Sequence, residues 1–83
     1  NPIINSSACE LYPNPGKEIL NIESKLDDLH IELFDVNGKL KFNLQLESGS
    51  NKLDVSNLPG GIYLYRVFDK KKHQVQTGKW LKY

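Results

Sequence analysis

The chain has 83 residues, 39% of them hydrophobic and 25% charged, and its formal net charge is +1. This length provides one small domain with one core, and it excludes a protein that combines a substrate domain with a cofactor domain. The nearly neutral charge argues against a nucleic-acid binder that neutralises phosphates, and no apolar run approaches the roughly 20 residues that span a bilayer. We therefore expect one folded domain with no nucleic-acid partner and no transmembrane segment.

Apolar and polar residues alternate in short runs along the chain, and turn-forming residues separate the runs. This period of two is typical of β-strands, and no window keeps the spacing of an amphipathic helix over three turns. The first eight residues, NPIINSSA, predict a linker, and residues 9–83 predict the folded domain. Within the domain we expect about seven strands, namely Cys9 to Tyr12, a run through Leu20 and Ile22, a run through Ile31 and Leu33, Leu40 to Leu46, a run through Leu53 and Val55, Ile62 to Phe68, and Gln74 to Leu81.

The segment HIELFDVNGKLKFNLQLE predicts a β-hairpin. Its Asn37-Gly38 pair separates two alternating runs, and both residue types tolerate the positive φ angles of tight two-residue turns. The polar crossover SKLDDL is expected to cover Leu26 and Leu29. Seven short strands at this spacing predict an all-β fold, a small antiparallel β-sandwich. Its core is predicted to include Leu20, Ile22, Ile31, Leu33, Leu53, Val55, Tyr63 and Val67.

The sequence offers no set of residues suited to catalysis or metal binding. His30 and His73 are the only histidines and Cys9 is the only cysteine, and none has the spacing of a metal site or of a nucleophile with its base. The segment DVNG, from Asp35 to Gly38, predicts a turn, because the later ligands of a calcium loop are absent. We therefore expect no catalytic residue, no metal and no cofactor, and a protein that is not an enzyme.

Aromatic and basic residues raise two further possibilities. A sugar-binding platform could be built from aromatic side chains, although most of these are expected in the core or at its rim. The aromatic residues in question are Phe34, Phe42, Tyr63, Tyr65 and Trp80. Residues 69–83 hold five lysines against the single Asp69, which predicts either a solvated face or a surface that a partner recognises.

Five motifs follow one another in a characteristic order: LYPNP (11–15), ILNI (19–22), IELFDVNGK (31–39), LDVSNLPGGIYLYRV (53–67) and GKWLKY (78–83). In this order they resemble the C-terminal sorting domain of cargo proteins of the type IX secretion system, in its type A, immunoglobulin-like form. The resemblance covers residues 11–83. It implies matching residues at four places. These are Pro13, Asn14 and Pro15 at the first turn, Asp35 and Gly38 at the hairpin, Gly61 and Tyr63 at the strand start, and Lys79 and Lys82 on the terminal strand.

The resemblance implies a signal that is recognised as a folded domain. Its partners would be the type IX translocon, a signal-processing peptidase and an upstream cargo domain in the same precursor. The cargo would pass through the periplasm of a Gram-negative cell and cross the outer membrane to be secreted or to stay at the cell surface. The domain would then be cleaved within or before NPIINSSA.

We interpret most of the motif residues as structural. Pro13 and Pro15 fix φ, Gly38 and Gly61 permit turns, and Tyr63 is expected to anchor a strand while its hydroxyl stays near water. NLPGGIYLYRV is thus expected to be scaffold. It would present a recognition tail that a partner contacts by strand pairing or by charge, made of Lys79, Trp80, Leu81, Lys82 and Tyr83. The alternative function is an immunoglobulin-like accessory module that binds carbohydrate or protein for an upstream enzyme.

Overall fold

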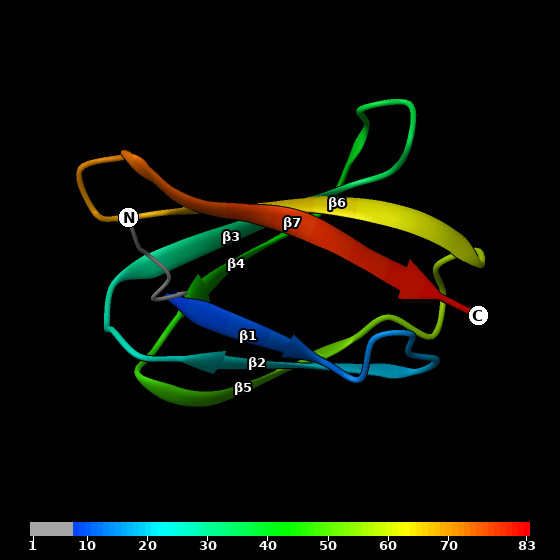
Figure 1. Ribbon diagram of the computed structural model, residues 1–83, viewed down its shortest axis with the longest axis horizontal. Helices are drawn as coiled ribbons and strands as arrows, with labels where there is room; N and C mark the ends of the chain where they lie inside the picture. The colour runs from blue at the N-terminus through cyan, green and yellow to red at the C-terminus, as the bar shows by residue number, and fades with distance from the viewer. Residues whose placement is uncertain (1–7) are drawn as a thin grey trace, which may run out of the picture.

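A computed structural model describes residues 8–83, and over this range the chain forms seven β-strands and no helix (Figure 1). The strands are β1 (Cys9–Tyr12), β2 (Ile19–Ser24), β3 (Leu29–Phe34), β4 (Leu40–Leu46), β5 (Gly49–Asp54), β6 (Gly61–Phe68) and β7 (Gln74–Lys82). The four strands that were predicted with both ends are confirmed to within one residue, and the other three runs fall on β2, β3 and β5, except that Val55 follows the end of β5. The predicted linker, apart from Ala8, lies outside the described residues.

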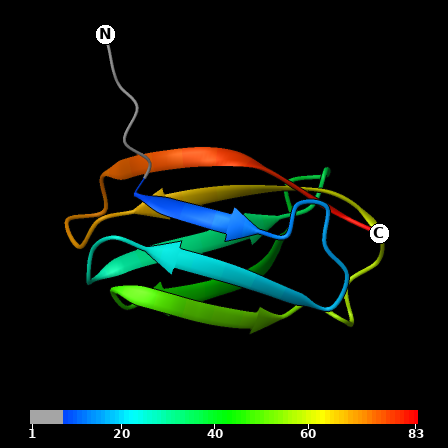
Figure 2. The ribbon, with the colours of Figure 1, turned by 60° about the horizontal axis from the view of Figure 1, so that its bottom comes forward.

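The strands form two antiparallel sheets that pack face to face. One sheet has the order β1-β2-β5 and the other the order β4-β3-β6-β7, and Figures 1 and 2 show them as two separate layers. The seven strands and the two packed antiparallel sheets confirm the predicted all-β, immunoglobulin-like sandwich. One strand differs from a constant-type immunoglobulin domain, in which the fourth strand belongs to the sheet of strands one, two and five. Here β4 is hydrogen-bonded to β3 in the other sheet.

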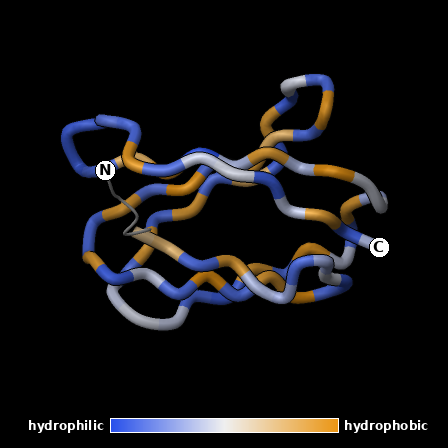
Figure 3. Tube along the Cα trace, in the orientation of Figure 1, coloured by the Kyte–Doolittle hydropathy of each residue, from blue (hydrophilic) through white to orange (hydrophobic). Residues whose placement is uncertain are grey.

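The core lies between the sheets and follows from the period-two pattern of the strands. In β2 and β3 every second side chain is buried, because successive side chains of a strand point to opposite faces. The same alternation of apolar and polar residues is visible along the chain in Figure 3. The buried apolar residues are Cys9, Leu20, Ile22, Leu29, Ile31, Leu33, Leu46, Val55, Tyr63, Val67 and Trp80.

Most predicted core residues are buried, with two corrections. Leu53 is only partly buried, because it lies on the edge strand β5, where one side of the strand has no neighbour. Leu26 is 54% exposed, whereas Leu29 is buried as expected. The reason is that Ser24 and Leu26 form a local turn, in which the Ser24 hydroxyl donates to the Leu26 carbonyl over 2.6 Å. This turn leaves the Leu26 side chain in solvent.

The β3–β4 connection differs in detail from the two-residue turn that Asn37-Gly38 predicts. Gly38 has a φ of 83°, but Asn37 does not have a positive φ. The backbone N–H of Asp35 donates to the Lys39 carbonyl and that of Gly38 to the Asp35 carbonyl, each over 3.0 Å. The Asp35 carboxylate accepts from the N–H groups of Asn37 and Lys39. Asp35 thus closes a longer loop, because its side chain binds N–H groups that the ladder leaves unpaired.

The β6–β7 connection repeats this arrangement with a different residue at the strained position. Asp69 accepts from the N–H groups of Lys71 and His73, and its own N–H donates to the His73 carbonyl. Lys72 stands where Gly38 stands in the first turn, and its φ is 67°. A side chain in this left-handed region costs free energy that glycine does not.

We predict that Lys72→Gly raises the free energy of unfolding by up to about 1 kcal/mol, because glycine relieves the left-handed strain while losing some unfolded-state restriction. Chemical denaturation measures the change. Lys70→Gly, in the same turn but without a positive φ, is the control and should lower stability by about 0.5–1 kcal/mol. Equal effects of the two substitutions would contradict the assignment of strain to Lys72.

Candidate functional site

The five residues of the predicted recognition tail do not form one exposed surface. On β7 and at its end, Lys79, Leu81 and Tyr83 are exposed, whereas Trp80 has no exposed area and Lys82 is 9% exposed. The alternation of the strand separates them, because neighbouring residues face opposite sides of the sheet. Trp80 is therefore a core residue and not part of an accessible tail.

Trp80 packs beside Tyr63 of its own sheet and binds the β1–β2 connection through its N–H. Its ring lies 6.0 Å from the ring of Tyr63, and its Nε1 donates to the Pro13 carbonyl over 2.7 Å. A buried indole N–H needs such a partner. Gly16 makes room for the ring, since a Cβ at this position would lie 2.8 Å from Cζ2 of Trp80. The large side chain at position 80 thus depends on the missing side chain at position 16.

The segment 13–16, here called the β7 clamp, also binds the backbone of β7. The Asn14 side chain donates to the Lys79 carbonyl over 3.2 Å and accepts from the Leu81 N–H over 3.0 Å. The Gly16 N–H then donates to the Leu81 carbonyl, and the Tyr83 N–H to the Gly16 carbonyl, each over 2.9 Å. Asn14 and Gly16 act as a short extra strand beside the end of β7.

The β7 clamp blocks strand pairing, one of the two ways in which a partner was expected to bind the tail. The outward backbone groups from the Lys79 carbonyl to the Tyr83 N–H already have partners within the domain. Strand addition at this edge would first have to displace the β7 clamp. The tail can therefore be contacted only through its exposed side chains while the domain stays folded.

Gln76 ties the other half of β7 to β1. Its side-chain Oε1 accepts from the Cys9 N–H over 2.8 Å, and its Nε2 donates to the Cys9 carbonyl over 2.9 Å. The amide thus binds Cys9 as a neighbouring strand would. Burial raises the pKa of the Cys9 thiol, which favours the neutral form and argues against a nucleophile.

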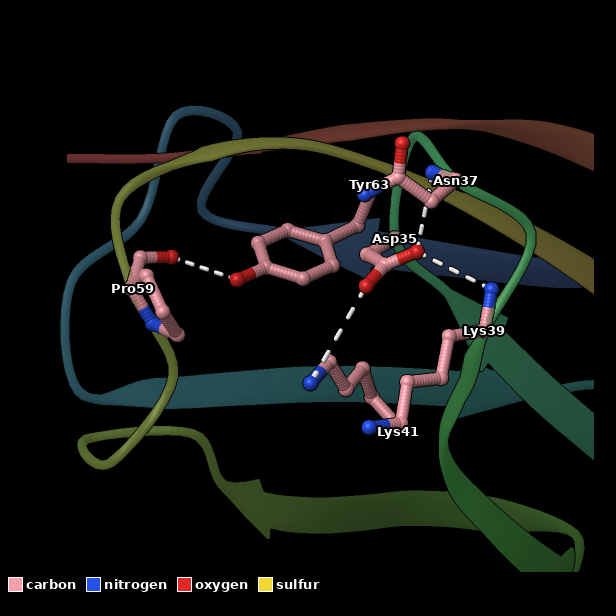
Figure 4. Close-up of polar contacts among 6 residues, drawn as sticks. All are labelled: Asp35, Asn37, Lys39, Lys41, Pro59 and Tyr63. Carbon is pink, nitrogen blue, oxygen red and sulfur yellow. Dashed lines mark hydrogen bonds and ion pairs between the residues drawn. The ribbon is translucent and has the colours of Figure 1, made fainter.

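Tyr63 lies at the corner where the chain enters β6. Its side chain is 4% exposed, and its hydroxyl donates to the Pro59 carbonyl four residues upstream (Figure 4). This is the arrangement of a tyrosine corner in immunoglobulin-like sandwiches. The hydroxyl, which was expected near water, is thus bonded to the carbonyl of the exposed Pro59. Burial raises the pKa of Tyr63, and the nearby Asp35 charge adds to this.

The remaining motif residues have structural positions. Figure 4 shows the Asp35 carboxylate between the N–H groups of its turn and the Lys41 ammonium, which lies 3.9 Å away. Those N–H groups, of Lys39 first and then Asn37, lower the pKa of Asp35. Gly61 begins β6 with a φ of 149°. None of these contacts brings a nucleophile to a base.

Aromatic and metal-binding alternatives find little support in the geometry. Of the aromatic residues considered for a sugar platform, Tyr63 and Trp80 are buried and Phe42 and Tyr65 pack against the core. Within residues 8–83 there is no cluster of three or more histidine, cysteine, aspartate or glutamate side chains that could hold a metal ion.

The comparison with protein families agrees with the order of the motifs. Residues 10–81 match the family model of the secretion system C-terminal sorting domain. The chain belongs to this family. A search of the curated proteins finds no match. The sorting domain is thus a signal for type IX secretion, which places its protein among those exported to the cell surface or secreted by Gram-negative cells. In the described part of the sorting domain, no helix is long and apolar enough to cross a membrane.

Sequence reasoning missed two residues that hold the sorting domain's terminal strand, Gly16 and Gln76. Gly16 directly follows the Pro13 to Pro15 motif, so its position was a usable signal for a close backbone approach. Gln76 had no such signal, because it is one polar residue in a polar segment. Only the distance between β1 and β7 in space reveals what its amide binds.

We predict that Gly16→Ala lowers the free energy of unfolding by about 1–3 kcal/mol, because the new methyl group would overlap the Trp80 ring and the Pro13 carbonyl. Trp80 is the only tryptophan, so its fluorescence during denaturation reports the unfolding directly. Lys17→Ala, at the exposed neighbouring residue, should change stability by no more than about 0.5 kcal/mol. A Gly16→Ala domain as stable as the parent would disprove the close packing.

We predict that Tyr63→Phe costs about 0.5–1.5 kcal/mol, because the hydrogen bond from the Tyr63 hydroxyl to the Pro59 carbonyl is lost. Tyr83→Phe, at a residue that is 68% exposed, is the matched control and should be nearly neutral.

The pH dependence provides a second readout of Tyr63. Its folded pKa is raised, so its contribution to stability is present below the unfolded pKa of about 10 and is lost as the pH rises further. Denaturation between neutral pH and pH above 10 should show a smaller loss in Tyr63→Phe than in the parent. The same loss in both would mean that the Tyr63 hydroxyl does not contribute to the alkaline destabilisation.

Proposed function

We propose that this domain carries an upstream cargo protein across the outer membrane through the type IX secretion system and is then removed. The observation that carries the proposal is the family match over residues 10–81. The partners would be the translocon, which recognises the domain in the periplasm, and a signal-processing peptidase. The peptidase would cut within or before residues 1–8, and the cargo would be secreted or remain at the cell surface.

The packing of β7 supports recognition of a folded body. An unfolded signal peptide would present its terminal residues in sequence, whereas here Trp80 lies in the core and the β7 clamp pairs the adjacent backbone. The terminal residues that a partner can contact in the folded domain are therefore Lys79, Leu81 and Tyr83. The role of the domain would be to present a surface and not to catalyse a reaction.

The structure also shows which experiment tests recognition by the tail. Deleting residues 79–83 would remove Trp80 and with it part of the core, so a loss of export would also follow from unfolding. A single exposed charge change is the better probe, since such substitutions usually alter stability by no more than about 0.5 kcal/mol.

We predict that a soluble reporter with its own inner-membrane export signal reaches the cell surface or the medium when this domain is fused to its C-terminus in a host with type IX secretion. Lys79→Glu should leave the reporter in the periplasm, because it reverses an exposed charge of the terminal strand. Lys52→Glu, an exposed residue of β5 in the other sheet, is the control and should be exported like the parent. Cell fractionation measures the distribution.

Retention of the parent fusion in the periplasm, while a known cargo is exported, would refute the sorting function and leave the accessory-module alternative. If Lys79→Glu and Lys52→Glu are both exported normally, the domain still acts as a signal but Lys79 is not part of what the partner recognises.

A further inference from the structure

The first half of strand β6 is apolar on both of its faces. Tyr63 and Val67 point into the core, whereas Ile62 and Leu64 point outward and are 48% and 42% exposed. An antiparallel strand with one solvated face normally alternates apolar and polar residues. Packing within the domain therefore explains only the inward half of GIYLYRVF.

The outward apolar residues of β6 continue across the sheet. In the strand register Ile62 lies opposite Leu81 of β7, and Leu64 lies opposite Phe34 of β3. Directly opposed residues of an antiparallel pair share a face. Leu40 of β4 is paired with Phe34 across a shift in the β3–β4 register and is exposed beside it. These five residues form what we call the outer apolar patch, and all of them except the partly exposed Phe34 are between 39% and 48% exposed.

The outer face of the other sheet carries mainly polar residues, with pairs such as Glu10↔Glu23. Its exposed large apolar residues, Tyr12 and Ile19, lie opposite the polar residues Asn21 and Asp54 and not opposite each other. Exposed apolar groups that gather on one face mark interaction surfaces more often than exposed groups scattered singly. The outer apolar patch is thus a specific feature of the four-stranded sheet.

The charges around the outer apolar patch are mainly basic. Lys79 lies opposite Leu64, and the Arg66 guanidinium lies 4.6 Å from the centre of the Phe34 ring. Lys39 is exposed in the turn before Leu40. The carboxylates beside these groups in the described residues are Glu32, opposite Arg66, and Asp35, which lies in the same turn as Lys39 and is 3.9 Å from the Lys41 ammonium. An apolar centre with a basic rim fits a partner surface that is apolar and edged with carboxylates.

We propose that the outer apolar patch is where the domain docks onto a protein of the secretion system that presents an apolar surface edged with carboxylates. This inference rests on the proposed sorting function and names the surface by which the domain would be recognised. The strand NLPGGIYLYRV, expected to be only scaffold, would then serve both as core and as docking face.

Two other occupants fit the geometry less well. A second copy of this chain, related by a two-fold axis, would bring the basic rim against itself, which is electrostatically unfavourable. A cargo domain would precede Ala8 and Cys9 in the chain, and Cys9 is hydrogen-bonded to Gln76. Gln76 is five residues before Leu81 on β7, or roughly 16 Å along the strand, and β1 belongs to the opposite sheet. The cargo domain would therefore be attached away from the outer apolar patch.

The test compares two substitutions of one exposed residue, Leu64→Asp and Leu64→Lys. Both remove the apolar side chain and add one charge, but only the acidic one would repel carboxylates of the partner. Within the domain two effects on stability oppose each other, because the opposite residue Lys79 attracts an acidic neighbour, whereas aspartate is the poorer strand former of the two. Folding is therefore measured for both variants, and an export defect counts only for a variant that folds.

Export of the reporter fusion is measured by cell fractionation, and folding of each purified domain by Trp80 fluorescence. We expect Leu64→Asp to reduce export roughly tenfold or more, as for a central interface residue, and Leu64→Lys to reduce it less. Val75→Asn, at an equally exposed residue (44%) at the start of β7, should be exported like the parent. If neither Leu64 variant folds, the same two substitutions at Leu81 replace them.

Each other outcome contradicts the inference. Normal export of both Leu64 variants would exclude the patch as the docking face, while export of the parent would leave the sorting function intact. Equal defects in the two variants would exclude a carboxylate-edged partner. A parent domain that sediments as a dimer, and a Leu64→Asp domain that sediments as a monomer, would assign the patch to a second copy. Retention of the parent fusion itself would refute the sorting function and this inference with it.

Discussion

The contact of Trp80 with the β7 clamp is the constraint on which the rest of the domain depends. The ring fills the space between the sheets, its N–H needs the Pro13 carbonyl, and its position requires a residue without a side chain at Gly16. Asn14 and Gly16 then pair with the backbone beside it. The first turn and the last strand are thereby one structural unit, although they are more than 60 residues apart in the chain.

This unit determines what kind of signal the domain can be. The end of β7, from residue 79 to residue 83, has its backbone paired on both sides and its tryptophan buried, so it offers a partner only its alternate side chains. Recognition through this segment would then depend on the sheet that holds those side chains at fixed spacing. Residues that never touch the partner, such as Gly16 and Gln76, would still influence export through the stability and orientation of β7.

The two faces of β6 have different environments, one in the core and one in solvent. On the inner face, the Tyr63 hydroxyl donates to the Pro59 carbonyl and the Tyr63 ring packs beside Trp80 of β7. Tyr63 thus anchors the start of β6 and contacts the end of β7. Leu64, one residue later, points to solvent within an apolar surface. Because side chains of a strand alternate, one short run can satisfy the core and supply a binding surface without compromise between them.

The sequence by itself determined the sandwich, because most of its strands are short, alternate apolar and polar residues, and are separated by strong turn formers. It also indicated the family, because the motifs occur in a fixed order. It did not show that Trp80 is buried or what Gln76 binds, because these depend on contacts between residues distant in the chain. Alternation shows that Leu64 and Trp80 face opposite sides of their strands, but only the pairing of β6 with β3 and β7 decides which side is the core and which residues gather on the other.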